Sequence, residues 1–276
     1  MKNFEANLIL AKQKEVIYGF LDEKILKDWN VLGEDETLND AFDRVAKSIL
    51  LFDENYTGGD SKKFETDILE HLTSKRMIPN TTIIMNAGRF RDVPLSACAV
   101  PLVGLRDDLK NIKQQVDELH FQGMGTGFDL DEAENPIEMI KYLNQVGIEG
   151  QRNKKQLRPV GDMGTMSLNN PNIQEFINLK NNVDLDNEKW VFNLSVSLDD
   201  EQIQKIINNE SIKLNNGKEI FVEEVLDDIS ESIWKSGDPG LLFIDRIRVD
   251  NTVPSAGESV SVAPCGEVGL AHGETC

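Results

Sequence analysis

The sequence contains few cysteines and histidines, and this scarcity limits the kinds of site it can form. Three cysteines and three histidines occur in 276 residues, and the first residues, Met1–Glu5, lack the apolar core of a secretory signal. A secreted disulfide framework is therefore not expected, and we predict a cytoplasmic protein. Cys265 and Cys276 stand eleven positions apart, which is neither a zinc-finger nor a thioredoxin spacing, so we expect no metal site.

Positive charge and long apolar runs are also scarce. The sequence has 29 lysines and arginines and 48 aspartates and glutamates, which gives a formal net charge of −19. Such a charge repels polyphosphate backbones, so we expect no nucleic-acid partner. No apolar run approaches the roughly 18–20 residues that span a bilayer, so we expect no membrane partner either. A small anionic nucleotide can still bind through local backbone donors.

The hydrophobic pattern predicts a helical region at residues 1–78. Thr37 is placed to cap a helix, and seven apolar side chains recur on one face behind it. Those seven are Leu38, Ala41, Phe42, Val45, Ala46, Ile49 and Leu50. Phe64, Ile68, Leu69 and Leu72 mark a second short helix. We interpret both helices as core packing.

From residue 79 onward, short apolar runs alternate with helical patterns. Runs at 93–103, 189–198 and 241–245 predict strands, and the first of these carries Cys98. Asn135-Pro136, Asn170-Pro171 and Asp199-Asp200 indicate helix starts, and Asn216-Gly217 predicts the tip of a small hairpin. Strands that alternate with helices predict an α/β fold with parallel strand pairing.

Another helix is predicted to begin at Asp107 or Asp108. Its predicted buried side consists of Leu109, Ile112, Val116 and Leu119. We interpret the acidic start as a helix cap in preference to a ligand.

Residues 123–128, Gly-Met-Gly-Thr-Gly-Phe, alternate glycine with other residues. Glycine lets a backbone approach a ligand closely. The segment lacks both the spacing of a Rossmann fingerprint and the Gly-Lys-Ser/Thr of a P-loop. A tight turn and a ligand cradle are therefore both open from the residues alone.

The closing segment of the sequence holds Cys265 and Cys276. Pro264 and Gly266 flank Cys265 and disfavour a helix or strand interior, because proline lacks a donor and glycine is entropically costly there. We predict a tight loop that holds the Cys265 thiol beside the Glu267 carboxylate, over a bound substrate. The alternative interpretation is that the thiols are buried and unreactive.

Seven segments occur in the same order as similar segments of one known family. They are Asn86-Ala87-Gly88; Leu95-Ser96-Ala97-Cys98; residues 123–128; Arg158-Pro159 before Asn170-Pro171-Asn172-Ile173; Phe192-Asn193-Leu194-Ser195; Gly237-Asp238-Pro239-Gly240; and Pro264-Cys265-Gly266-Glu267. From about residue 36 to the end, the sequence thus resembles the catalytic chain of ribonucleotide reductase. The eleven-residue spacing from Cys265 to Cys276 is similar to that of the adenosylcobalamin-dependent class II enzymes. A class I enzyme, with a different radical source, remains an alternative. The resemblance implies that residues 79–276 form the N-terminal part of a ten-stranded α/β barrel, after the small helical region.

The resemblance also implies roles for four residues. Cys265 matches the thiyl-radical cysteine that abstracts the ribose 3′ hydrogen, and Glu267 matches the general base that takes the 3′-OH proton. Cys98 and Cys276 match the dithiol that reduces the 2′ carbon and becomes a disulfide, which an external dithiol resets by exchange. The implied activity is reduction of ribonucleoside di- or triphosphates to 2′-deoxyribonucleotides.

Binding positions are implied in the same way. The positions that match substrate contacts are Thr81, Thr82, Ser96, Gly125 and Gly127. Asp107 and Leu109 match positions that bind an allosteric dNTP or ATP effector, with helix capping as the competing interpretation. The implied cofactor is adenosylcobalamin. The implied partners are a ribonucleoside di- or triphosphate, the nucleotide effector and a thioredoxin-like dithiol reductant.

The sequence departs from the family pattern in two places. The family has asparagine two positions before the radical cysteine, where its amide bonds the substrate ribose, and this chain has Ala263. Losing such a bond costs roughly 1.5–3 kcal/mol, so we expect weak activity, another substrate or a substitute donor such as Asn86. The family's second barrel half lies beyond Cys276, so we expect a fragment completed by a C-terminal half or a homodimer. The alternatives are a reductase-like paralogue in nucleoside metabolism and a non-catalytic nucleotide-binding partner chain.

Overall fold

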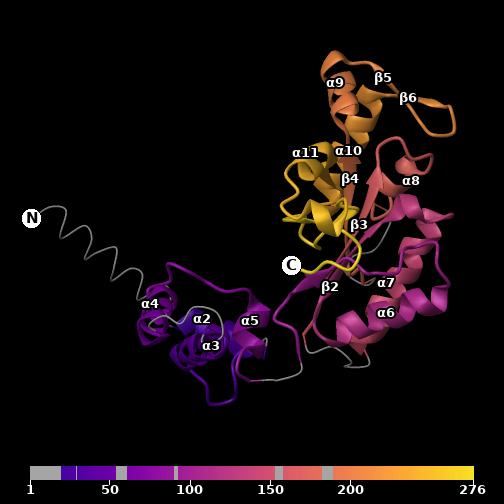
Figure 1. Cartoon of the computed structure of the whole chain (residues 1–276). Coiled ribbons are helices and arrows are strands. Elements are labelled where there is room, and N and C mark those ends of the chain that lie inside the picture. Colours follow the sequence, from indigo (N-terminus) through magenta and orange to yellow (C-terminus); the bar gives the residue numbers. More distant parts are fainter. Residues whose placement is uncertain (1–19, 29, 54–60, 90–92, 153–157, 182–188) are drawn as a thin grey trace, which may run out of the picture. The chain divides into compact units, whose positions relative to one another are not determined.

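The computed structural model describes residues 20–28, 30–53, 61–89, 93–152, 158–181 and 189–276 (Figure 1). The chain divides into two compact units, Met1–Ala97 and Cys98–Cys276. Residues 1–19 of the predicted helical region lie outside the described residues.

Among the described residues, no helix combines the length and the apolar character that crossing a membrane requires.

The first unit is helical. Its described helices are α2 (Phe20–Asp28), α3 (Leu38–Asp53), α4 (Ser61–Thr73) and α5 (Thr81–Asn86). Apolar side chains spaced at helical intervals on α3 and α4 meet in a small core that includes Phe42, Val45 and Leu72. The two helices predicted from Thr37 and Phe64 are thereby confirmed.

Helix α5 joins this helical unit. Ile84 and Met85 of α5 are buried against Ala41 of α3 and against Val31 and Leu32. The first compact unit therefore extends to Ala97, past the domain boundary predicted between residues 78 and 79. The division of the chain into two domains at that boundary stays a prediction.

The second unit is built on a parallel five-stranded sheet with the order β1-β2-β3-β4-β7. The strands are β1 (Cys98–Ala99), β2 (Gly125–Asp129), β3 (Asp162–Ser167), β4 (Phe192–Leu198) and β7 (Gly240–Phe243). The helices of this unit are α6 (Leu109–Phe121), α7 (Pro136–Arg152), α8 (Ile173–Ile177), α9 (Asp200–Asn208), α10 (Val222–Ser236) and α11 (Ile244–Val249), with short 3-10 turns η1 (Leu130–Glu132) and η2 (Pro254–Ala256). The predicted α/β fold with parallel pairing is confirmed.

Helices α6 and α7 lie on one face of the sheet, and the C-terminal segment lies on the other (Figure 1). The predicted inward residues of α7, Ile137, Ile140, Leu143 and Val146, are all buried in the main core. A fully buried aliphatic side chain of this size stabilises the fold by about 1.5–3 kcal/mol, so this helix fixes the sheet firmly from one side.

Two antiparallel hairpins complete the second unit. Strands β5 (Ser211–Lys213) and β6 (Glu219–Phe221) pair around Asn216 and Gly217, and Gly217 has a φ of 86°. This confirms the predicted hairpin, because a turn with positive φ favours glycine. The second hairpin consists of β8 (Ser261–Val262) and β9 (Gly269–Leu270).

Four local predictions differ from the structure. Residues 125–129 form the buried strand β2 and not a turn. The run at 93–103 contributes only the two-residue strand β1, and the run at 241–245 leaves the sheet after Phe243 to begin α11. Leu109 does not face inward: it is 49% exposed, because it is the first helical residue after the cap Asp108.

Candidate active site

The β8–β9 hairpin carries Cys265 at its tip. The N–H of Ala263 donates to the oxygen of Val268 at 2.9 Å, and the N–H of Gly266 donates to the oxygen of Ala263 at 2.8 Å. Gly266 has a φ of 76°, a conformation that suits glycine at a tight turn. The structure thus confirms the predicted tight loop, and Cys265 is exposed there as a free thiol.

Glycines in β2 let this loop lie directly against the sheet. A Cβ at Gly125 would lie 2.2 Å from the oxygen of Gly161 and 2.8 Å from Cγ of Pro264. A Cβ at Gly127 would lie 2.0 Å from the oxygen of Val262. The alternating glycines are therefore explained by close backbone packing, and their role as substrate contacts stays a prediction.

Glu267 lies between Cys265 and Cys98. Its Oε2 accepts the backbone N–H of Cys265 at 3.2 Å, and its Oε1 lies 3.8 Å from the sulfur of Cys98. The side chain is exposed. The carboxylate can therefore exchange a proton with a molecule seated over the loop.

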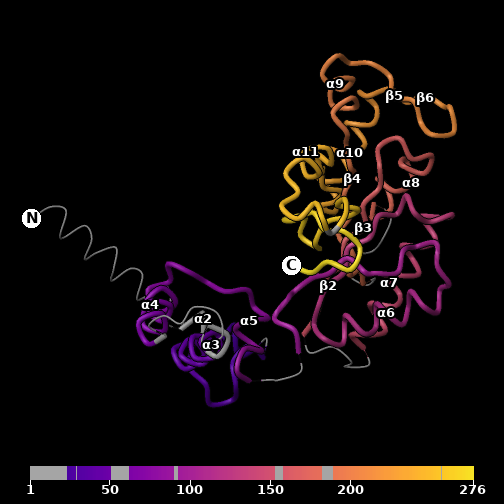
Figure 2. The backbone as a smooth tube through the Cα atoms, in the orientation of Figure 1, coloured from indigo at the N-terminus to yellow at the C-terminus, as the bar shows by residue number. Residues whose placement is uncertain are grey.

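Cys98 and Cys276 form a disulfide across 178 residues of sequence, with their Cα atoms 5.4 Å apart. The N–H of Cys276 donates to the oxygen of Cys98 at 3.0 Å, and the N–H of Val100 donates to the oxygen of Glu274 at 3.0 Å. These bonds lay the C-terminal segment along β1 (Figure 2). The donor atoms of Cys98, Cys276 and Glu267 lie within 4.8 Å of one another, and the disulfide removes both thiolates as metal ligands.

Two further residues bond to segments at this end of the sheet, Asn193 to the loop that carries Cys265 and Arg158 to the residues just before β2. The side chain of Asn193 donates from Nδ2 to the oxygen of Pro264 at 2.8 Å. Arg158 donates from Nε to the oxygen of Gly123 at 2.9 Å. Burial lowers the pKa of the Arg158 guanidinium, and the neighbouring Cys265 opposes that change. Both residues belong to the family-like segments of the sequence, but no local pattern assigned them a role.

The other predicted substrate contacts lie in the first unit. Thr81 is exposed, Ser96 is half-buried, and Thr82 is fully buried and donates its hydroxyl to the oxygen of Leu95 at 2.7 Å. Their part in substrate binding stays a prediction. Asn86 is fully buried, and its Nδ2 donates to the oxygen of Pro94 at 2.9 Å. Because that amide is already bonded and buried, the structure argues against Asn86 as the substitute donor.

The predicted effector residues border a surface cavity of about 720 Å³. Asp107 and Leu109 line it together with Glu132 and Tyr142. The helix cap is Asp108, which accepts the N–H of Lys110 at 2.8 Å, so the carboxylate of Asp107 is not needed for capping. Effector binding at Asp107 and Leu109 stays a prediction.

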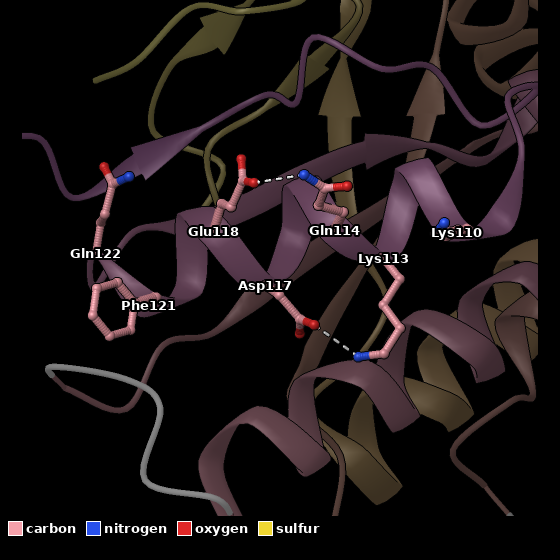
Figure 3. A pocket seen from close by; sticks show the side chains of 7 residues that line it. All are labelled: Lys110, Lys113, Gln114, Asp117, Glu118, Phe121 and Gln122. Atoms are coloured by element: carbon pink, nitrogen blue, oxygen red, sulfur yellow. Dashed lines mark hydrogen bonds and ion pairs between the residues drawn. The ribbon is translucent and has the colours of Figure 1, made fainter.

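A separate cavity of about 420 Å³ lies on the outer side of α6 (Figure 3). Its polar side chains pair along the helix: Lys113 with Asp117 and Gln114 with Glu118, each at 2.9 Å. None of the predicted site residues lines this cavity.

The loop with Cys265 sits at the amino-terminal end of the sheet, since it contacts Gly125 and Asn193 at the starts of β2 and β4. One strand, β1, supplies Cys98, and the C-terminal segment brings Cys276 beside it. A thiol, a carboxylate and a disulfide thus converge in one place.

Comparisons with known proteins agree with this arrangement. The family described as "Ribonucleotide reductase, barrel domain" matches residues 96–276. The chain belongs to the ribonucleotide reductase barrel-domain family. It is 32% identical over 233 residues, or 75% of its length, to the vitamin B12-dependent ribonucleoside-diphosphate reductase of Thermoplasma acidophilum. It is 26% identical over 265 residues, or 87% of its length, to the reductase of the same description from Mycobacterium tuberculosis.

The chain spans 29% and 37% of the lengths of these two ribonucleotide reductase relatives. The resemblance inferred from seven short segments is confirmed by the family match and by both relatives. The activities named for the relatives belong to proteins much longer than this chain.

Proposed function

We propose that this chain carries the radical and redox cysteines of an adenosylcobalamin-dependent ribonucleotide reductase. The observation that carries the proposal is the convergence of exposed Cys265, Glu267 and the Cys98–Cys276 disulfide at one end of the sheet. A radical carrier, a general base and a two-electron reductant are the three functions that replacing a ribose 2′ hydroxyl with hydrogen requires.

The proposed reaction removes the ribose 2′ hydroxyl as water and puts hydrogen in its place. Cys265, as a thiyl radical, takes the 3′ hydrogen of the ribose while Glu267 takes the 3′-OH proton. The 2′ hydroxyl leaves as water with a proton from the dithiol, and the dithiol delivers the replacing hydrogen to the 2′ carbon. One electron of Cys98 and Cys276 leaves with the hydrogen atom delivered to the 2′ carbon, the second reduces the 3′ ketone that results, and the two residues become a disulfide. Cys265 then returns the hydrogen to the 3′ carbon, and Glu267 returns its proton.

The contacts of Glu267 support these roles. The backbone N–H of Cys265 holds one carboxylate oxygen, which keeps base and radical carrier adjacent. The other oxygen lies 3.8 Å from the sulfur of Cys98, so a reduced Cys98 can hydrogen-bond to the same carboxylate. One group is therefore placed to move a proton at the 3′ position and at the dithiol.

The exposure of Cys265 fits a radical source that acts on its sulfur from outside this part of the fold. When bound, adenosylcobalamin supplies the oxidation of a thiol to a thiyl radical. We assign no described residue to holding the corrin ring, and the steps above use only residues of this chain.

The partners follow from the same chemistry. The relatives are named for ribonucleoside diphosphates, so a diphosphate is the first substrate to test, with the triphosphate beside it. Cys276 is exposed, which gives a thioredoxin-like dithiol access to the disulfide. A nucleotide effector at Asp107 and Leu109, and completion by a C-terminal half or a homodimer, belong to the same proposal.

A test of this function uses Cys265→Ser, with Ser255→Ala as an exposed control. Each protein is given adenosylcobalamin, a dithiol and each ribonucleotide, with and without the portion of a relative that follows the matched region. We expect deoxynucleotide from the parent chain and from Ser255→Ala, and none from Cys265→Ser, because serine forms no comparable radical. Equal product from all three proteins would exclude Cys265 as the radical carrier.

One observation favours a second candidate, a non-catalytic or redirected paralogue. Ala263 replaces the family's asparagine and is fully buried, so its position offers no polar group to a ribose. Nucleotide binding without deoxynucleotide from any of the tested ribonucleotides, even with the complementing portion present, would support this second candidate.

A further inference from the structure

His272 is bonded through both nitrogens of its ring. Its Nδ1 lies 2.8 Å from the oxygen of Pro101, and its Nε2 lies 2.8 Å from Oε1 of Glu132. The ring is half-buried, and Glu132 is 140 positions away in sequence. These contacts join the C-terminal segment to η1 and to the segment that follows β1.

The chemistry of these partners requires a proton on each ring nitrogen. A backbone carbonyl only accepts, so Nδ1 carries a hydrogen. The second oxygen of Glu132 accepts the N–H of Leu105 at 3.1 Å, so the Glu132 side chain serves as an acceptor there and Nε2 donates to its other oxygen. His272 is therefore an imidazolium, paired with a carboxylate.

The segment that carries His272 also carries Cys276. The N–H of Gly273 donates to the oxygen of Val100 at 2.9 Å, and that of Ala271 donates to Oε2 of Glu274 at 2.7 Å. The first bond attaches the segment to the residues after β1, the second lies within the segment, and the charge-assisted pair of His272 and Glu132 adds an attachment to η1. His272 thus anchors the segment four residues before the disulfide.

Glu132 also holds the segment with the predicted effector residues. Its side chain accepts the N–H of Leu105, and its backbone oxygen accepts a hydrogen bond from Nε of Arg106 at 3.1 Å. The Glu132 side chain also packs closely on Gly104, where an added Cβ would lie 3.0 Å from Oε2. The same glutamate therefore connects the segment of Asp107 with the segment of Cys276.

We propose that His272 and Glu132 form a proton-dependent clasp that positions Cys276 against Cys98 and so favours the disulfide over the dithiol. The pair is a positioning device and touches neither the sulfurs nor a substrate. The inference rests on the proposed redox role of Cys276 for its biological meaning, and the clasp can be measured without turnover.

The pH dependence has a definite sign. Burial lowers the pKa of His272, but the hydrogen bonds to Pro101 and Glu132 and the charges of Glu132 and Asp129 outweigh it, so the net pKa is raised. A raised histidine pKa means that the clasp is complete below the ordinary value near 6.5 and is lost as pH rises through the folded value. Arg106 is the basic group bonded to Glu132, and Asp129, with its own pKa near 7, titrates in the same range.

The first test measures the Cys98–Cys276 disulfide in glutathione redox buffers for the full chain, His272→Gln and Glu132→Gln. His71→Gln, which removes an exposed histidine of the first unit, is the matched control. At about pH 6 we expect both clasp variants to form the disulfide about 5-fold less favourably than the parent chain, a coupling typical of linked sites. Above the folded pKa of His272, the variants and the parent should agree.

The second test uses the reciprocity of linkage and needs no variant. The pKa of His272 is measured by NMR in the oxidised and in the reduced chain. A 5-fold coupling corresponds to a pKa higher by about 0.7 in the oxidised form. An equal pKa in both forms, or clasp variants that match His71→Gln at low pH, would overturn the proposal. Deoxynucleotide formation that persists in Cys265→Ser would overturn the proposed function alone, because neither the redox titration nor the NMR titration depends on turnover.

Discussion

At the scale of single residues, Glu267 has the most demanding position. It is exposed to a molecule above the loop, yet its two oxygens are directed to Cys265 and toward Cys98. A carboxylate held by a backbone donor stays oriented, and this favours a general base.

We therefore expect Glu267→Gln to lower the rate of deoxynucleotide formation by about 10²–10⁴, the usual contribution of a positioned base. The amide oxygen can still accept the N–H of Cys265, so the loop should keep its shape. The measurement is the turnover rate, with formation of the Cys98–Cys276 disulfide in redox buffer as the control for structure. A rate within a factor of two of the parent would show that Glu267 is not the base.

Asp129 has a strongly raised pKa. It ends β2, and burial raises its pKa from 3.8 to about 7, with the charges of Asp131 and Glu132 acting in the same direction. A carboxyl group with a raised folded pKa stabilises the fold most at low pH, and that stability is lost as pH rises through about 7.

Between pH 5.5 and 7.5, this single group should lower the free energy of unfolding by about 2 kcal/mol. Asp129→Asn removes the ionisation, so its stability should fall less than that of the parent over the same interval. Urea denaturation at both pH values measures the difference. Parallel pH profiles for the two proteins would mean that Asp129 is ionised throughout and that its burial is less costly than the structure indicates.

At the scale of elements, β2 and the β8–β9 hairpin form one packed unit. Gly127 has no room for a side chain, because Val262 brings its carbonyl oxygen against the strand. Gly161 differs, since the nearest atom to an added Cβ there is the oxygen of Val191 at 3.8 Å. Neither glycine has a positive φ, so the two positions differ only in the space available to a side chain.

Gly127→Ala should therefore destabilise the second unit by at least about 1–3 kcal/mol, the usual cost of overpacking, while Gly161→Ala should change stability little. Urea denaturation of both variants gives the comparison. The accessibility of Cys265 to a thiol reagent should also rise in Gly127→Ala, because the hairpin must move away from the strand. Equal stability of the two variants would contradict the close approach of Val262.

The elements that the sequence predicted well are those with strong local patterns. Helix α7 follows from apolar residues at helical spacing, and α9 from the cap Asp199, which forms a full capping box with Gln202. Strand β2 was missed because Gly-Met-Gly-Thr-Gly-Phe has low strand propensity. Its neighbours β1 and β3 and the overlying hairpin force it into the sheet, and tertiary context of this kind overrides propensity.

At the scale of the whole molecule, the site depends on contacts between distant parts of the sequence. No local pattern pairs Cys98 with Cys276 across 178 residues, and the pairing was anticipated only through resemblance to a family. The bond between His272 and Glu132 spans 140 positions and was not anticipated at all. The hydrogen bonds of Asn193 and Arg158 were not predicted from the sequence either, because each joins segments that are far apart along the chain.

The central claim is that Cys265, Glu267 and the Cys98–Cys276 pair form one reductive site, and a single-turnover measurement tests it most directly. The chain is reduced, freed of reductant, and given adenosylcobalamin and a ribonucleotide, together with the portion of a relative that follows the matched region. Deoxynucleotide and remaining thiols are then counted. We expect one deoxynucleotide per chain, matched by conversion of Cys98 and Cys276 to the disulfide, and neither change in Cys265→Ser. Bound ribonucleotide with no deoxynucleotide and all thiols retained would contradict the claim.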